Sequence, residues 1–346
     1  GSYYEASDLT TFTLTKNYKG VQPSHSQAGR VNVTTNNQGF RGTSDIQPNK
    51  KNILIVGDSY TFGLYVGDDE TFPSEIQRLT DDKYKNIQII NAGYASGHET
   101  DQQYVWLKHN IEKFAPKIVI LGVFVGNDIL GIDNNAWRDI DKLGLPNIWS
   151  SNILHVTEDG YIRSNKEDNI FRLLATIYRY PSIRNYHLPI LFARAWDRLW
   201  RRKNDFDDKS FQHIFGVYSD EFLEKEKLFL SLILGMREVV EKNDAYFVVA
   251  LLPINFMVDN FHIAKVIPGS AHQNSRSVYY ERLEKYLSSK GIESLNVERA
   301  MVQNPGVEPY FPTQGEVHFN ANGNKFTGKT IFEKLEQEGI LSSISE

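Results

Sequence analysis

Short, unbroken apolar runs recur along this chain, each closed by a turn residue. Residues 53–56 read Ile-Leu-Ile-Val without alternation and end at Gly57. Such a run is typical of a strand buried on both faces of a parallel sheet, because an exposed face would impose alternation. We therefore predict a central strand here, and further strands at 87–91, 117–122, 246–252 and 292–295.

Helical periodicity fills the intervals between these runs. We expect helices at 72–80, 99–114 and 276–287, a long helix capped by Ser219, and a C-terminal helix that ends near residue 338. Alternation of strand and helix predicts a parallel sheet with right-handed crossovers. The fold class is therefore α/β.

Two stretches break this rhythm. Residues 1–50 are polar and irregular, with a weakly alternating edge strand at 10–15. Arg41 is expected as a structural clamp on nearby carbonyls, with a role in the site as the alternative. Residues 131–218 exceed any ordinary connection, whose median length is about 4–6 residues. We expect an N-terminal extension packed on the core (1–50), a main domain (51–130 and 219–346) and a helical cap insertion (131–218).

Composition narrows the class of protein. The chain has 346 residues, 40% hydrophobic and 23% charged, which is ordinary for a soluble globular protein. A net charge of −5 argues against nucleic acid as a partner, and the lack of Cys excludes disulfides, thiolate zinc sites and cysteine nucleophiles. No apolar run approaches the roughly 20 residues that cross a bilayer. Gly1-Ser2 has the form of a cloning remnant, which leaves room for a native leader or anchor.

Charge is concentrated in the expected cap. Residues 163–203 carry ten Lys/Arg and three Asp/Glu, a local charge of +7 that leaves −12 for the rest. Apolar pairs four residues apart at 191–200 form an amphipathic stripe. One interpretation is a cap whose stripe packs on the body and whose basic side chains are solvated. The other is a cationic lid that attracts an anionic polymer or a membrane surface.

The candidate chemistry begins directly after the first strand, at Gly57-Asp58-Ser59. Gly57 permits a sharp turn, and Asp58 and Ser59 suit the start of a helix. Open α/β sheets bind ligands at the carboxyl ends of their strands, and a helix N-terminus favours negative charge. Ser59 is thus placed either as an attacking hydroxyl or simply as a helix cap.

Four blocks in order resemble the SGNH hydrolases, the GDSL-type esterases and lipases. They are GDSYTFG at 57–63, a Gly in the loop after the second strand, GND at 126–128, and His318 with a following Asn and Gly. The blocks span residues 52 to about 330. The resemblance implies a flavodoxin-like αβα sandwich, with Ser59 as nucleophile and His318 as base.

The resemblance also implies an oxyanion hole built from the Ser59 N–H, the Gly97 N–H and the Asn127 side chain. Gly93 is the competing choice for the second donor. Converging donors matter because losing one typically reduces the rate by about 10²–10³-fold. Four residues near these blocks are expected to contact substrate, namely Asp58, Tyr60, His98 and Asp128.

The chain departs from the family at the third triad member. The usual acid is an Asp two or three residues before the His, where this chain has Glu316 and Gly315. Glu316 is long enough to orient the imidazole, as Glu does in some α/β-hydrolases. A backbone carbonyl that orients His318 is the alternative.

Three functions remain open at this point. The first is an esterase that removes acyl groups, acetyl first, from carbohydrate or another envelope ester. The second is an O-acyltransferase of cell-surface polysaccharide, and the third is a catalytically idle glycan- or lipid-binding module. No cofactor and no metal are expected, since no HExxH motif or clustered His/carboxylate spacing occurs. We expect a bacterial periplasmic, cell-envelope or secreted location, and the oligomeric state stays open.

Bulky side chains near the strand ends favour a short acyl group, because they would narrow an acyl pocket. They are Tyr60, Phe62, Tyr94 and Phe124.

Overall fold

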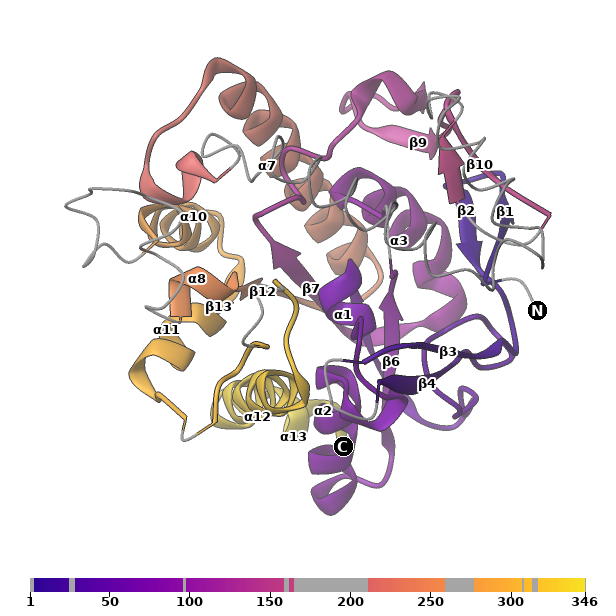
Figure 1. Ribbon diagram of the computed structural model, residues 1–346, viewed down its shortest axis with the longest axis vertical. Coiled ribbons are helices and arrows are strands. Elements are labelled where there is room, and N and C mark those ends of the chain that lie inside the picture. Colours follow the sequence, from indigo (N-terminus) through magenta and orange to yellow (C-terminus); the bar gives the residue numbers. More distant parts are fainter. Residues whose placement is uncertain are drawn as a thin grey trace, which may run out of the picture.

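A five-stranded parallel sheet forms the centre of the computed structural model (Figure 1). The structure describes residues 3–24, 29–95, 98–158, 162–164, 211–258, 277–306, 308–312 and 317–345. The strands lie in the order β13-β12-β7-β5-β6, which is 2-1-3-4-5 read from the other edge in chain order. This is the flavodoxin-like order, so the predicted fold class is confirmed. Their bounds are β5 Lys51–Gly57, β6 Ile87–Gly93, β7 Pro116–Phe124, β12 Tyr246–Leu252 and β13 Glu293–Asn296.

Helices cover both faces of this sheet (Figure 1). On one face α2 (Phe72–Lys83) packs against α12 (Ala321–Gln337), and on the other α3 (Thr100–Phe114) packs against α7 (Asp220–Lys242). Residues 53–56 of β5, 118–121 of β7 and 247–252 of β12 are buried between these layers, which explains their unbroken apolar runs. The remaining described helices are α8 Asn255–Val258, α10 Val278–Ser289, α11 Val297–Gln303 and α13 Ile340–Ser345. None of the described helices has the length and apolar character needed to span a bilayer.

The N-terminal extension is more regular than its sequence suggests. It forms two antiparallel hairpins, β1 (Tyr4–Ser7) with β2 (Thr11–Leu14), and β3 (Lys19–Pro23) with β4 (Arg30–Thr34). The strand predicted at 10–15 exists but pairs with β1 instead of edging the central sheet. Its weak alternation is real, because Phe12 and Leu14 are buried while Thr11 and Thr13 are half-buried.

The described part of the insertion contains two hairpins and short 3-10 turns, while nearly all of the segment expected to be helical, 163–203, lies outside the described residues. A 3-10 turn (Asn134–Ala136) leads into β8 (Trp137–Ile140) and β9 (Pro146–Trp149), followed by β10 (Leu154–Val156) and β11 (Ile162–Ser164). The Trp149 N–H donates to the Leu9 carbonyl at 2.8 Å, which ties the insertion to the N-terminal extension. The amphipathic stripe at 191–200 and most of the basic run lie outside the described residues.

Candidate active site

The turn after β5 places Ser59 at the carboxyl end of a strand inside the sheet. The one-turn helix α1 (Ser59–Phe62) begins directly after Asp58, whose Oδ1 accepts the Tyr60 N–H at 2.9 Å. Gly63 ends the turn with φ +80°, a conformation that favours glycine. Asp58 rather than Ser59 is therefore the helix cap, which leaves the Ser59 hydroxyl for other partners.

Helix α1 lies directly on the sheet because two paired strands carry glycine beneath it. Gly57 and Gly93 are partners in the β5–β6 register. A Cβ at Gly57 would lie 2.1 Å from Thr61 Oγ1, and one at Gly93 would lie 2.3 Å from the Phe62 nitrogen. The Gly93 N–H donates to Asn91 Oδ1 at 3.0 Å, so Gly93 serves packing here and its N–H is already used. Gly97, the preferred second donor, lies outside the described residues.

His318 comes from the far end of the chain to meet Ser59. Its Nε2 lies 2.8 Å from Ser59 Oγ, although 259 positions separate the two residues. The Tyr60 hydroxyl donates to the Val317 carbonyl, and the Tyr60 ring lies 4.9 Å from Phe319. The helix that carries Ser59 therefore also holds both neighbours of His318.

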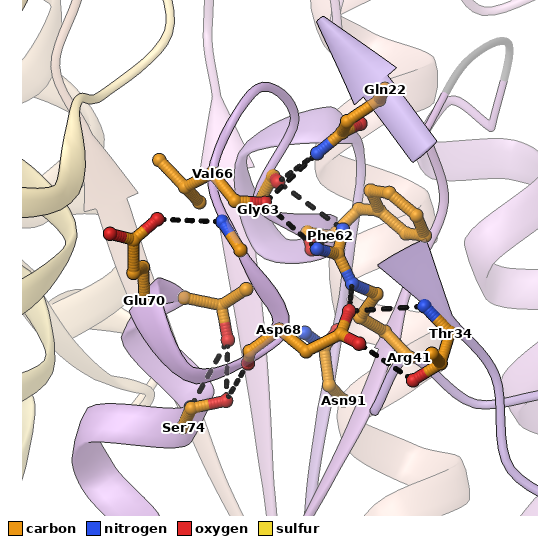
Figure 2. A network of polar contacts seen from close by, with 12 residues as sticks. Gln22, Thr34, Arg41, Phe62, Gly63, Val66, Asp68, Glu70, Ser74 and Asn91 are labelled. Carbon is orange, nitrogen blue, oxygen red and sulfur yellow. Dashed lines mark hydrogen bonds and ion pairs between the residues drawn. The ribbon is translucent and has the colours of Figure 1, made fainter. Parts of the chain in front are cut away.

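Arg41 holds the loop that follows α1 (Figure 2). Its guanidinium donates to the carbonyls of Phe62 at 3.2 Å, Gly63 at 3.3 Å and Val66 at 2.9 Å. Its Nε also donates to Asp68 Oδ1 at 2.6 Å, and its side chain is only 1% exposed. The prediction that Arg41 is a clamp on nearby carbonyls is confirmed.

The same network is completed by side chains from the N-terminal hairpin (Figure 2). Gln22 Nε2 donates to the Val66 carbonyl at 2.9 Å, and Asp68 accepts from Thr34 through both its N–H and its hydroxyl. The loop held in this way carries Tyr65, whose ring lies 5.6 Å from the His318 ring in an edge-on arrangement. We call Gln22, Thr34, Arg41 and Asp68 the arginine network.

Asn127 lies in the turn after β7, against the start of α3. Its Nδ2 donates to Glu99 Oε2 at 3.0 Å. The neighbouring Asp128 accepts the Phe124 N–H at 2.8 Å, and the Thr100 hydroxyl donates to the Asp128 carbonyl at 3.0 Å. These hydrogen bonds join the two segments, and the Asn127 amide contacts Glu99 as well as Asp58.

Several buried acids gather around Asn127. Burial, together with the charges of Asp58 and Asp101, raises the pKa of Glu99 to about 8, against the lowering effect of the hydrogen bond from Asn127. Burial raises the pKa of Asp58 to about 6, against the lowering effects of the Tyr60 N–H, the His318 charge and the Asn127 side chain. Burial and the charges of Asp58 and Glu99 hold the pKa of Asp128 well above its usual value. Glu99 is therefore largely protonated at neutral pH.

This group of acids is not arranged as a metal site. Among the residues that the structure describes, no three His, Asp or Glu side chains are placed to hold a metal ion together. Instead, the charge of each ionised acid disfavours ionisation of its neighbours.

The four residues expected to contact substrate lie beneath the surface instead. Exposed fractions are 3% for Asp58, 2% for Tyr60, 2% for His98 and 0% for Asp128. His98 stacks on Tyr94 with ring centroids 3.6 Å apart, and burial lowers its pKa to about 3. It is a neutral core residue. The aromatic residues expected to narrow the acyl pocket are also buried, so they fill the layer beneath the site: Tyr60, Phe62, Tyr94 and Phe124.

Two glutamates of the candidate site differ in how the sequence treated them, since Glu316 was predicted and Glu99 was not. Glu316 lies outside the described residues, so its role as the acid of a triad stays a prediction. Glu99 was missed, because a Glu at a helix start is a common neighbour of a cap and nothing local links it to Asn127, 28 positions away. A pair of acids two residues apart at a predicted helix start, Glu99 and Asp101, is the one signal that pointed to it.

No protein-family model and no curated protein matches the sequence. Among solved structures, the chain is similar to an acetyl xylan esterase (12% identity, 82% of this chain and 99% of that one, TM-score 0.43). It is also similar to a lipase/acylhydrolase from Enterococcus faecalis (12% identity, 83% of this chain and 96% of that one, TM-score 0.41). A third similar structure is a member of the lipolytic protein G-D-S-L family from Veillonella parvula DSM 2008 (10% identity, 83% of this chain and 100% of that one, TM-score 0.39).

Proposed function

We propose that this protein is a serine ester hydrolase of the SGNH type. The observation that carries the proposal is the contact of 2.8 Å between Ser59 Oγ and His318 Nε2. A serine hydroxyl becomes a useful nucleophile when an imidazole is positioned to take its proton. The four sequence blocks that resemble the family supply these two residues, and the fold brings them together at the carboxyl end of β5.

In the proposed reaction, Ser59 Oγ attacks the ester carbonyl carbon while His318 Nε2 takes the hydroxyl proton. The tetrahedral oxyanion is stabilised by the Ser59 N–H and the Asn127 amide, together with the Gly97 N–H as the expected second backbone donor. His318 then gives its proton to the leaving alcohol, and water repeats the sequence on the acyl-enzyme. The acceptor role of Nε2 requires the remaining ring proton on Nδ1.

The substrate we propose is an acyl ester, acetyl first, of a carbohydrate or another envelope component. The test is a panel of p-nitrophenyl esters from acetate to dodecanoate, together with acetylated glycans, on wild type and Ser59→Ala. We expect turnover by wild type and its loss in Ser59→Ala with an unchanged melting temperature, because only one hydroxyl is removed from a preformed turn.

A Ser59→Ala variant that keeps most of the ester turnover would overturn the assignment. Addition of a deacylated glycan as acceptor separates hydrolysis from acyl transfer. A hydrolase releases acid in proportion to the alcohol, whereas a transferase releases alcohol and moves the acyl group to the glycan.

A further inference from the structure

Glu99 is fixed in place beside the Asn127 amide. It lies at the start of α3, and its carboxylate oxygen accepts Asn127 Nδ2 at 3.0 Å. The turn that carries Asn127 closes around it, since the Gly131 N–H donates to the Asn127 carbonyl at 2.7 Å. A Cβ at Gly131 would lie 2.7 Å from Glu99 Cδ, so the turn packs against the carboxyl group and a side chain at 131 would displace it.

The ionisable groups that face Glu99 are acids. Asp58 approaches from the β5–α1 turn, Asp101 from α3 itself, and Asp128 from the turn after β7. His318 acts on Asp58 and lowers its pKa. Asp101 is committed elsewhere, because its carboxylate accepts from the indoles of Trp137 at 2.8 Å and Trp149 at 3.0 Å.

We propose that Glu99 is a positioning residue that keeps the Asn127 amide available to an oxyanion only while Glu99 itself is protonated. The inference rests on the proposed ester hydrolysis. Its basis is the direct contact between a half-buried carboxyl group and the one side-chain donor assigned to the oxyanion hole.

Two physical effects follow when Glu99 loses its proton. The hydrogen bond from Asn127 becomes charge-assisted, so the amide is held toward Glu99 more strongly. A negative charge also stands beside the position where a second negative charge must develop in the transition state. Both effects act on the transition state, so kcat falls while KM for a neutral ester changes little. The raised pKa of Glu99, about 8, places this loss just above neutral pH.

The kinetic test is Glu99→Gln, which keeps the side-chain length and an acceptor oxygen but cannot ionise. The matched control is Glu112→Gln, the same change at an exposed position on the same helix. For wild type and the control, we expect kcat on a neutral acetyl ester to fall about tenfold per pH unit above the Glu99 pKa. Glu99→Gln should keep kcat at pH 7 within a few-fold of wild type and lose this alkaline fall.

A readout independent of turnover is the side-chain amide resonance of Asn127 in protein labelled with ¹⁵N-asparagine, assigned by its disappearance in Asn127→Ala. In wild type it should shift with a midpoint near pH 8, and in Glu99→Gln it should not. An Asn127 resonance indifferent to pH between about 6 and 9.5, or the same alkaline fall of kcat in Glu99→Gln, would overturn the inference. Absence of ester turnover by wild type would instead count against the proposed function, and the resonance would still decide the role of Glu99.

Discussion

The two sides of the Ser59 site differ in how their charges are compensated. On one side, the arginine network sets the Arg41 cation against Asp68 and three loop carbonyls. On the other side, Asn127 lies among the acids Asp58, Glu99 and Asp128, whose charges repel one another. One side is a matched ion pair with satisfied partners. On the other side, burial and the neighbouring negative charges raise the pKa values of Glu99 and Asp128.

Because of this difference, we expect the arginine network to stabilise the fold and the acid side to respond to pH. An arginine does not lose its proton in a protein, so the arginine network holds the loop of Tyr65 at any ordinary pH. A buried acid with a raised pKa changes charge near neutrality, so the contact between Glu99 and Asn127 depends on pH.

Two acids at the start of α3 show the same contrast between a compensated and an uncompensated group. Asp101 and Glu99 are two residues apart, and burial raises the pKa of both. Asp101 accepts from two indole N–H groups and from the N–H groups of Gln102 at 3.0 Å and Asp133 at 3.1 Å. Its carboxylate is thus compensated by structure, which makes Asp101 an anchor for the insertion rather than a group that senses pH.

The largest effect should come from the acid side, through Asn127→Ala. Removal of an oxyanion donor typically lowers kcat by about 10²–10³-fold. The amide donates to Glu99, which is largely protonated at neutral pH, and also bonds the Asp58 side chain, so the free energy of unfolding should change less than the rate does. The measurement is kcat and KM for p-nitrophenyl acetate beside chemical denaturation at pH 7. A loss of stability that parallels the loss of rate would show that both sides of the site are structural.

A second, smaller effect should come from the arginine side, through Arg41→Met. The change keeps the apolar stem but leaves Asp68 and the carbonyls of the loop without the guanidinium. Breaking a buried ion pair by removing one partner destabilises by about 3 kcal/mol or more. The check is the free energy of unfolding from denaturant titration.

The control for this change is Arg78→Met on α2, where the arginine side chain is 57% exposed and pairs with Glu75. Exposed ion pairs contribute less than about 1 kcal/mol. Equal losses of stability in the two variants would remove the distinction between the arginine network and an ordinary surface pair.

The sequence predicts the sheet well because its inner strands bury both faces. The runs at 53–56, 117–122 and 246–252 cannot alternate, and they match β5, β7 and β12. The N-terminal hairpins escape this reasoning, since β1 to β4 are four or five residues long and only partly buried.

Within the site, sequence reasoning finds residues whose chemistry is distinctive and misjudges those whose role depends on direction. Ser59 and His318 stand at the ends of recognisable blocks, and the fold joins them. Tyr60 and His98 also stand near strand ends, but their side chains point into the core, which no local pattern reveals. Contacts such as Glu99 with Asn127 are made only by tertiary packing.

The central claim is that Ser59 carries the acyl group during turnover, and rapid acid quenching tests it most directly. Wild-type protein is mixed with an acetyl ester, quenched within the first turnovers, and examined by intact mass and by peptide mapping. The account predicts one added acetyl group, located on the peptide that contains Ser59, and none in Ser59→Ala. Continued ester turnover with the acetyl group on another residue, or with no covalent intermediate and unchanged turnover in Ser59→Ala, would contradict it.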